Sequence, residues 1–175
     1  MGNPLGFKLK EVHPACVEVV SGSTEKYAFD PKTNTAILER ILPVPLLTDM
    51  NYGFLPGTLS RDRDPLDVII LSSIKLNMGQ VVNVVPVGII FTADEGGPDP
   101  KIVAVNKRDK VYGNVSDISQ IDEKFFEDIY NYLSNSKTLP GSWVEMYGTG
   151  GHDQAVLEIG QSRERMSALV HAERH

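Results

Sequence analysis

Short apolar runs separated by glycine and proline follow one another along most of the chain, and they constrain the fold more than any other feature. Such runs are typical of β-strands when turn residues bound them on both sides. The strand candidates are residues 17–20, 26–29, 36–41, 67–71, 81–91, 101–105 and 143–147. Many short strands at this spacing predict a β-barrel or a β-sandwich.

Helical periodicity is found only late in the chain. Apolar residues repeat at four-residue steps from Ile121 to Leu133, and a second helical segment begins near Asp153. Each spacing places the apolar side chains on one face of a helix, which is expected to pack against the strands. Residues 42–45 hold two prolines and are expected to form an extended connection. The predicted class is therefore mixed α+β, mainly β.

Length and composition indicate one globular unit. A chain of 175 residues suits a single domain over residues 1–175, and a hydrophobic fraction of 41% is typical of globular proteins. The net charge of −6 argues against a nucleic-acid partner. The longest apolar stretch, residues 84–91, is too short to cross a membrane. Residues 1–10 lack the pattern of a secretory signal, so a cytoplasmic location is expected.

A few other side chains have expected places. Cys16 is the only cysteine, which excludes an intrachain disulfide, and it is expected in the core. Trp143 and Tyr147 are also expected to fill core. Arg163 and Arg165 belong to no motif and are expected on solvated faces.

Three aspartates crowd one short turn that leads into an apolar run: Asp62, Asp64 and Asp67. Unit charges about 4 Å apart repel by roughly 4 kcal/mol at an effective dielectric near 20. A hard divalent cation converts that repulsion into coordination. A second acidic turn, residues 94–99, follows another apolar run. Two such turns that meet in space would hold more than one ion.

A single acidic turn is compatible with more than one kind of structure. Asp beside Pro and Gly is also common in ordinary surface turns. An EF-hand calcium loop fails on spacing, because counting from Asp62 the sixth position is Asp67 instead of Gly and the twelfth is Ser73 instead of Glu. A magnesium-like site that shares its ion with substrate phosphates fits the carboxylates better.

The run Asn-Tyr-Gly-Phe-Leu-Pro-Gly-Thr-Leu at residues 51–59, followed by Asp-Arg-Asp-Pro-Leu-Asp-Val at 62–68, resembles the signature of family I soluble inorganic pyrophosphatases. The resemblance extends over roughly residues 18–143. It implies a five-stranded OB-like β-barrel with flanking helices, and hydrolysis of pyrophosphate to two phosphates. It also implies Mg²⁺ as cofactor, with Mn²⁺ or Zn²⁺ as possible substitutes, and a homo-oligomer, a hexamer among bacterial members of this length.

The resemblance also implies roles for the acidic residues. Asp62, Asp67 and Asp99 would hold one magnesium ion, with Asp67 reaching a second. Asp94 and Asp99 would hold a third that arrives with substrate. Asp64 would be the general base, which a carboxylate can be when metals have made the attacking water acidic. Glu18 would lie in an outer shell and act through waters.

A cationic half of the site is implied in the same way. Lys26, Arg40, Lys101 and Lys137 would bind phosphate oxygens, with the Tyr52 phenol as a further donor. Arg40 can hold two oxygens through its planar guanidinium, whereas the lysines act as point charges. A lone Lys or Arg is more often a solvated surface charge, so these assignments depend on the resemblance.

Several positions depart from the family pattern. Ala28 stands where a Glu is usual, Thr48 where a Tyr is usual, and Ser142 where a Lys is expected. In the late helix, the family's phosphate-binding Tyr-Lys pair falls on Ser136-Lys137 in one alignment and on Tyr130-Asn131 in another. The first is preferred because it needs almost no gap.

These departures keep other functions open. A site with fewer phosphate-binding side chains is compatible with a divergent hydrolase that acts on nucleotides or short polyphosphate. An inactive OB-type module that binds metal is a further alternative. Phosphate release from a panel of such compounds separates the three.

Overall fold

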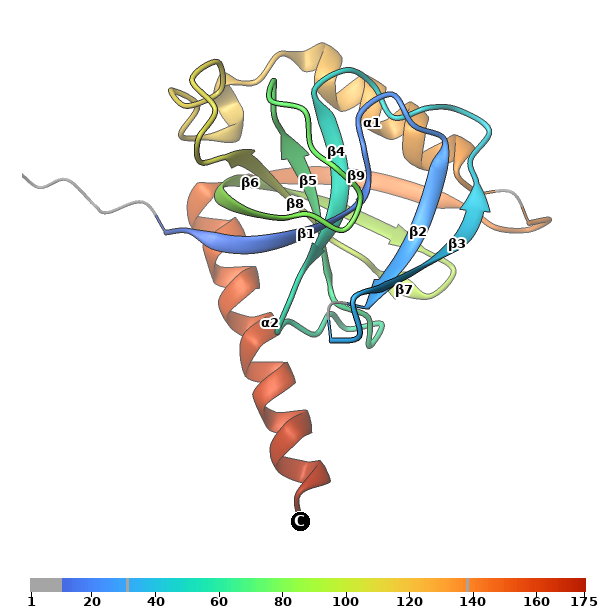
Figure 1. Cartoon of the computed structure of the whole chain (residues 1–175), viewed down its shortest axis with the longest axis vertical. Helices are drawn as coiled ribbons and strands as arrows, with labels where there is room; N and C mark the ends of the chain where they lie inside the picture. Colours follow the sequence, from blue (N-terminus) through green and yellow to red (C-terminus); the bar gives the residue numbers. More distant parts are fainter. Residues whose placement is uncertain (1–10, 31, 138) are drawn as a thin grey trace, which may run out of the picture.

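The computed structural model describes residues 11–30, 32–137 and 139–175 (Figure 1). Residues 1–10, on which the expectation of an absent signal depends, lie outside this description. Five strands form a ring: β1 (His13–Val19), β4 (Met50–Leu55), β5 (Leu66–Leu71), β8 (Lys101–Asn106) and β6 (Val81–Asp94). Pairing of β1 with β6 closes it, and β5–β8 is the parallel pair of the ring. The predicted five-stranded OB-like architecture is confirmed.

Apolar side chains cover both faces of the central strands. Along β5 and β8, successive residues alternate between two buried clusters, one of which includes side chains of α1 (Glu123–Asn135) and the other side chains of α2 (His152–Glu173). Strands that are buried on both faces read as continuous apolar runs. This explains why the sequence shows uninterrupted runs here instead of a polar–apolar alternation.

The two helices flank the ring as expected. Asp122 accepts a hydrogen bond from the backbone N–H of Lys124 at 2.9 Å and so caps α1, which follows the short 3₁₀ turn η1 (Ile118–Gln120). Helix α2 buries Ala155, Ile159 and Ser162 at its first half, and its C-terminal end extends away from the barrel (Figure 1). No helix in the described residues is both long and apolar enough to cross a membrane.

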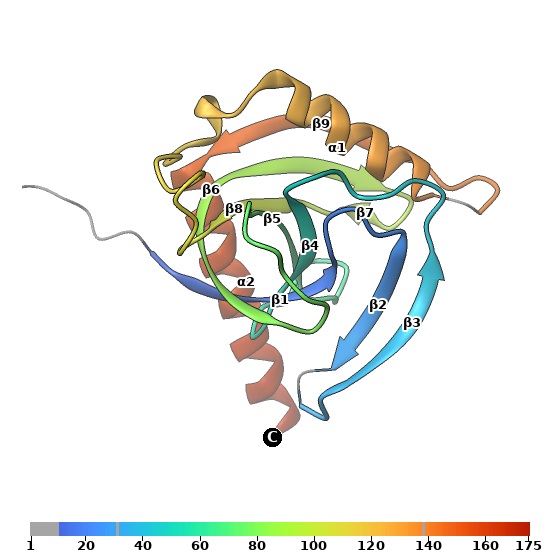
Figure 2. The same ribbon diagram turned by 45° about the horizontal axis from the view of Figure 1, so that its top comes forward.

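A separate hairpin stands beside the ring (Figure 2). It consists of β2 (Glu25–Asp30) and β3 (Thr35–Ile41), which pair only with each other in their own sheet. The register shifts between Lys26 and Tyr27, so Glu39 on β3 has no partner and forms a bulge. A bulge re-aims side chains, and here it turns Glu39 and Arg40 toward the same pocket.

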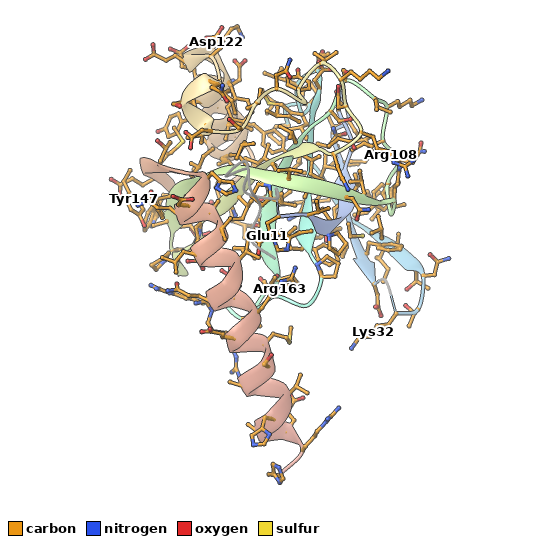
Figure 3. The ribbon with its side chains drawn as sticks, turned by 90° about the vertical axis from the view of Figure 1, so that its left-hand side faces the viewer. Glu11, Lys32, Arg108, Asp122, Tyr147 and Arg163 are labelled. Atoms are coloured by element: carbon orange, nitrogen blue, oxygen red, sulfur yellow. The ribbon has the colours of Figure 1, made fainter. Side chains whose placement is uncertain are left out.

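The remaining strands extend the sheet along β6. The short β7 (Gly97–Pro98) pairs with the end of β6, and β9 (Val144–Gly151) pairs with it over most of its length. The expectation that Trp143 and Tyr147 fill core is wrong. Their exposed fractions are 45% and 57%, and Figure 3 shows Tyr147 at the outer edge of the molecule. Cys16, by contrast, is fully buried as expected.

Candidate active site

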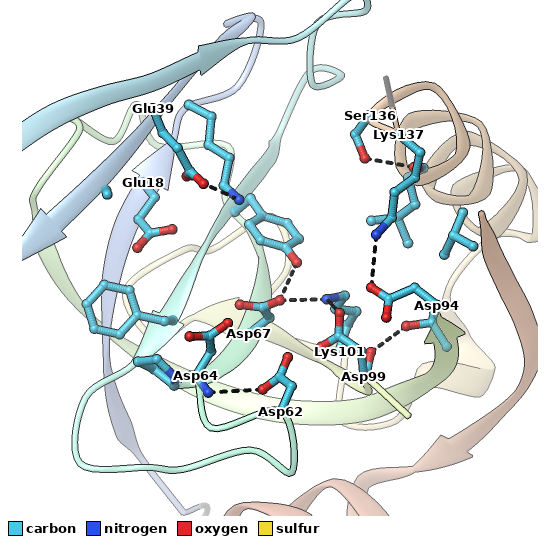
Figure 4. Close-up of a pocket in the computed structure, with 18 of the residues that line it drawn as sticks. Glu18, Glu39, Asp62, Asp64, Asp67, Asp94, Asp99, Lys101, Ser136 and Lys137 are labelled. Carbon is cyan, nitrogen blue, oxygen red and sulfur yellow. Dashed lines mark hydrogen bonds and ion pairs between the residues drawn. The ribbon is translucent and has the colours of Figure 1, made fainter. Parts of the chain in front are cut away.

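Every site residue selected from the sequence lines one pocket of about 400 Å³ (Figure 4). The pocket opens between the β2–β3 hairpin, the loop before β5, the turn after β6 and the C-terminal end of α1. Its lining includes the acidic residues Glu18, Asp62, Asp64, Asp67, Asp94 and Asp99 and the donors Lys26, Arg40, Tyr52, Lys101 and Lys137. The fold therefore brings both acidic turns to the same place as the cationic side chains.

The loop between β4 and β5 presents Asp62 and Asp64. The backbone N–H of Asp64 donates to Oδ1 of Asp62 at 3.0 Å, and the N–H of Ser60 donates to the Asp64 carbonyl at 2.7 Å. Arg63, between the two aspartates, has a φ of 73°, in the left-handed region that non-glycine residues seldom adopt. Desolvation raises the pKa of Asp62, and the nearby carboxylates Asp64 and Asp67 act in the same direction.

Lys101 lies between two of these carboxylates. Its Nζ is 2.6 Å from Oδ2 of Asp67 and 2.6 Å from Oδ2 of Asp99, and the residue is 5% exposed. The parallel register places Asp67 of β5 beside Lys101 of β8. Desolvation acts to lower the pKa of Lys101, but the two carboxylates outweigh it and raise it to about 12. The ammonium group therefore stays charged and balances the negative charges of two half-buried carboxylates.

Tyr52 joins the same group. Its phenol donates to Oδ2 of Asp67 at 2.7 Å, and its ring lies under the Lys101 ammonium with 5.8 Å from Nζ to the ring centroid. Desolvation, together with the carboxylates of Asp67 and Asp99, raises the pKa of Tyr52 well above its ordinary value. The neutral phenol is thus held as a hydrogen-bond donor. Desolvation also raises the pKa of Asp99, despite the ion pair with Lys101.

The opposite wall comes from the end of α1. Nζ of Lys137 is 2.9 Å from Oδ2 of Asp94 and 3.5 Å from Oε1 of Glu95. Desolvation acts to raise the pKa of Asp94, but hydrogen bonds from Lys137 and from the N–H of Gly96 lower it. Tyr130 is 46% exposed and is not part of the pocket lining, whereas Ser136 and Lys137 are. This placement favours the alignment of the late helix that puts the pair at Ser136-Lys137.

The hairpin side adds a residue that sequence reasoning missed. Oε2 of Glu39 lies 3.5 Å from Nζ of Lys26, and Glu39 lines the pocket. Adjacent strand residues normally point to opposite faces, so a sequence that places Glu39 next to Arg40 does not predict that both face one pocket. Nearby, desolvation raises the pKa of Glu18 to about 7, although Lys26 acts to lower it.

Arg40 is held by the end of α1. Its Nη1 donates to the Ser136 carbonyl at 3.1 Å, while the hydroxyl of Ser136 donates to the Leu133 carbonyl at 2.7 Å and so is occupied within the helix. Among the described residues, the buried Nε of Arg40 has no hydrogen-bond partner. A buried cationic donor without a partner is costly, and an anionic ligand oxygen would satisfy it.

The departures from the family pattern fall into two groups. Ala28 and Ser136 line the pocket with small side chains. Thr48 is exposed and lines a different hollow, and the hydroxyl of Ser142 donates to the Leu139 carbonyl at 2.6 Å outside the pocket. Of these positions, only Ala28 and Ser136 can reduce the number of contacts that the pocket makes to a ligand.

The acidic side chains of the pocket have the ligand chemistry that a metal ion needs, although in this structure they are not gathered around one point. Over residues 11–30, 32–137 and 139–175, no three His, Cys, Asp or Glu side chains lie close enough together to hold one. Lys101 and Lys137 instead pair with Asp67, Asp99 and Asp94. The pocket's acidic ligands are nevertheless all carboxylate oxygens, the chemistry that suits a hard divalent cation. A cation that binds them would compete with the two ammonium groups.

Comparisons with known proteins identify the family and the fold. A family model described as inorganic pyrophosphatase matches residues 15–167. The inorganic pyrophosphatase of Buchnera aphidicola subsp. Schizaphis graminum is 40% identical over 153 residues, which cover 85% of each chain. That of Sulfolobus acidocaldarius is 35% identical and covers 93% of this chain and 95% of its own. The crystal structure of the Thermus thermophilus inorganic pyrophosphatase superimposes with a TM-score of 0.83 at 34% identity, covering 94% of this chain and 97% of that one.

Proposed function

The chain belongs to the inorganic pyrophosphatase family, and from that premise we propose how its pocket carries out the hydrolysis of pyrophosphate. Family membership makes it a metal-dependent hydrolase that converts pyrophosphate to two phosphates. One observation carries the residue assignments. Carboxylates and cationic side chains line the same pocket, with Lys101 beside Asp67 and Asp99 and Lys137 beside Asp94 (Figure 4).

The acidic residues are proposed as the metal-binding half. Asp62, Asp67 and Asp99 would hold one Mg²⁺, and Asp94 with Asp99 another, while Glu18 would act from an outer shell. Bound magnesium would neutralise phosphate oxygens and lower the pKa of the attacking water. Mg²⁺ is proposed because all the acidic ligands are oxygens, which hard divalent cations prefer, and Mn²⁺ or Zn²⁺ is proposed as a substitute.

Asp64 is proposed as the general base. Within the described part of the chain, no hydrogen bond engages its carboxylate, whereas its backbone N–H is bound by Asp62. The carboxylate is thus available to accept a proton at an oxygen while the backbone fixes where it stands. The short acidic loop keeps it within the pocket lined by Asp67.

The cations are proposed to orient the substrate. Arg40, whose Nη1 is fixed by the Ser136 carbonyl, would present its remaining donors to one phosphate group. Lys26 and Lys137 enter from opposite walls, so pyrophosphate would be held from both sides. The Tyr52 phenol and Lys101 would stabilise charge that develops during the reaction.

The function is tested by measuring phosphate release from pyrophosphate while Mg²⁺ is titrated, with fluoride as an inhibition control. Asp67→Asn keeps the shape of the side chain and removes its charge, and we expect it to lower kcat by at least about 100-fold. Asp153→Asn is the matched control, because that carboxylate is 89% exposed on α2, away from the pocket. Full activity in Asp67→Asn would contradict the assignment of this residue.

Ala28 and Ser136 favour a second candidate substrate. Both side chains are small, and their size leaves room in the pocket for a longer phosphoanhydride. The same assay with tripolyphosphate and with nucleoside triphosphates measures this preference.

A homo-oligomer, a hexamer by resemblance, is also proposed. Light scattering of the purified protein measures the mass of the assembly.

A further inference from the structure

Helix α2 binds the loop that carries Asp62 and Asp64. Both backbone groups of Leu59, within that loop, contact the helix: its N–H donates to the Ser162 carbonyl at 3.0 Å, and its carbonyl accepts from Nε of Arg165 at 2.8 Å. Nη1 of Arg163 donates to the Pro56 carbonyl at 3.2 Å. The expectation that Arg163 and Arg165 are simply solvated is therefore wrong, and Figure 3 shows Arg163 beside the barrel.

Arg165 is itself held in place. Its Nη2 donates to Oε1 of Glu158 at 2.7 Å and to the hydroxyl of Ser162 at 2.8 Å. Residues 158, 162 and 165 share one face of the helix, because they are spaced by four and three positions. The side chains of Glu158 and Arg165 are 14% and 27% exposed, so the pair is less screened by solvent than a surface salt bridge.

The loop needs such an anchor. Residues 61–65 are all exposed, and among the described residues only local hydrogen bonds hold them together. The hydroxyl of Thr58 ties the two ends of the loop, because it donates to the Leu55 carbonyl and accepts from the N–H of Leu66. Leu59, which lies inside these ends, is fixed by α2. Exposed loops with few packing contacts open readily, and metal ligands tolerate little displacement.

We propose that Arg165, braced by Glu158 and Ser162, is a positioning residue that holds the backbone of the acidic loop at Leu59 and thereby places Asp62 and Asp64 in the pocket. This inference rests on the proposed metal-binding role of that loop. Arg165 is not part of the pocket lining, and within the described part of the chain its side chain hydrogen-bonds to Leu59, Glu158 and Ser162, so it would act through the backbone of Leu59. Its side chain links the last helix of the fold to the acidic loop.

The test compares Arg165→Met with Arg165→Lys, Glu158→Gln and the control Arg174→Met, which removes an exposed cation from the end of the same helix. In Arg165→Met we expect Mg²⁺ affinity by calorimetry to weaken by about tenfold, the scale on which outer partners of metal ligands act. Amide hydrogen exchange at Arg63 and Asp64 should speed up severalfold. The Mg²⁺ concentration for half-maximal activity should rise in parallel, while the KM for pyrophosphate changes less than twofold.

The variants separate positioning from general stability. Arg165→Lys keeps the positive charge but lacks the planar guanidinium. We therefore expect its Mg²⁺ affinity and loop exchange to lie between those of Arg165→Met and the wild type. Glu158→Gln keeps Arg165 and weakens the ion pair that holds it, so we expect a smaller loss of Mg²⁺ affinity. This variant provides the test if Arg165→Met does not fold. Unchanged Mg²⁺ affinity and loop exchange in both would overturn the proposal. A wild-type protein that neither binds Mg²⁺ nor releases phosphate would overturn the proposed function alone, because loop exchange still reports on Arg165.

Discussion

Lys101 sets the charge balance at the centre of the pocket. The residue is buried, and its ammonium group lies 2.6 Å from a carboxylate oxygen of both Asp67 and Asp99. Removal of one partner from a buried ionic group leaves uncompensated charge, which costs far more than the net value of the original pair. The same two carboxylates are the ones proposed to bind metal. The ion pairs of Lys101 and the binding of Mg²⁺ should therefore compete for the same two carboxylates.

Lys101→Met tests that link. Without added metal and in the presence of a chelator, we expect the variant to unfold at lower urea concentration, with a loss of about 3 kcal/mol, because two carboxylates lose their counter-charge. Saturating Mg²⁺ should stabilise the variant more than the wild type, since the cation no longer competes with the ammonium group. Lys107→Met, at an exposed position, is the control. Equal stabilisation of both proteins by Mg²⁺ would count against a shared site.

Cys16 gives a simple probe of core integrity. Its side chain is fully buried, and desolvation, with a smaller contribution from Glu18, raises the pKa of its thiol to about 11. The thiolate is the reactive form, so a thiol reagent at pH 8 should label the native protein at least about 100-fold more slowly than the urea-unfolded chain. The time course of colour release from an aromatic disulfide reagent measures both rates. Rapid labelling of the native state would show that β1 opens easily.

At the level of strands, the close approach of β1 to β4 explains a glycine of the sequence signature. A Cβ added at Gly53 would lie 1.9 Å from the backbone carbonyl oxygen of Cys16, which no real side chain can do. The strands are paired at this point, where Gly53 faces Val17 beside a register shift. The glycine next to Tyr52 therefore has a structural reason that is separate from the chemistry of its neighbour.

Gly53→Ala should consequently destabilise the barrel. We expect a loss of about 3 kcal/mol in the free energy of unfolding, because either β1 or β4 must shift to relieve the clash. Gly160→Ala is the matched control: nothing lies within 4 Å of its added Cβ, and alanine favours a helix by about 1 kcal/mol. Urea titrations of the two variants should thus move in opposite directions. A neutral Gly53→Ala would show that the ring is more adaptable than its backbone contacts indicate.

Across the whole molecule, α2 is divided between a packed part and a projecting part. Its buried residues end at Ser162 and its contacts to the acidic loop end at Arg165, whereas residues 171–175 are all exposed (Figure 1). The first part closes one face of the barrel and reaches the pocket loop. The last turn touches little of the rest of the described chain.

Two truncations should therefore behave differently. A chain that ends after Val170 should keep its melting temperature within a few degrees, because exposed residues contribute little to stability. A chain that ends after Leu157 loses Ile159, Ser162 and Arg165, and we expect it to unfold near room temperature or to fail to fold, since Ile159 belongs to a buried cluster. Calorimetry of both chains, with pyrophosphate hydrolysis as a second readout, gives the comparison. Equal melting of the two would mean that α2 is not part of the cooperative unit.

The sequence predicts most of the elements, because strand and helix signals are local, but its strand candidates omit residues 50–55, which form β4 of the ring. The mainly apolar runs at residues 81–91 and 101–105 predict strands that the structure contains, and the helix expected near Asp153 begins at His152. The acidic turns were recognisable too, since aspartates spaced by two and three positions demand a counter-charge wherever they lie. The chemical inventory of the pocket could thus be read before its geometry.

What the sequence by itself determined was most of the elements and which carboxylates and cations the chain makes available, because periodicity and motif spacing depend on neighbours along the chain. The tertiary structure decided which of these groups meet. The parallel register of β5 with β8 brought Lys101 against Asp67, and the bulge in β3 turned Glu39 into the pocket. Packing of α2 placed Arg165 on the Leu59 carbonyl. These contacts join residues far apart in sequence, and their geometry is set by strand register and helix packing, for which no local pattern exists.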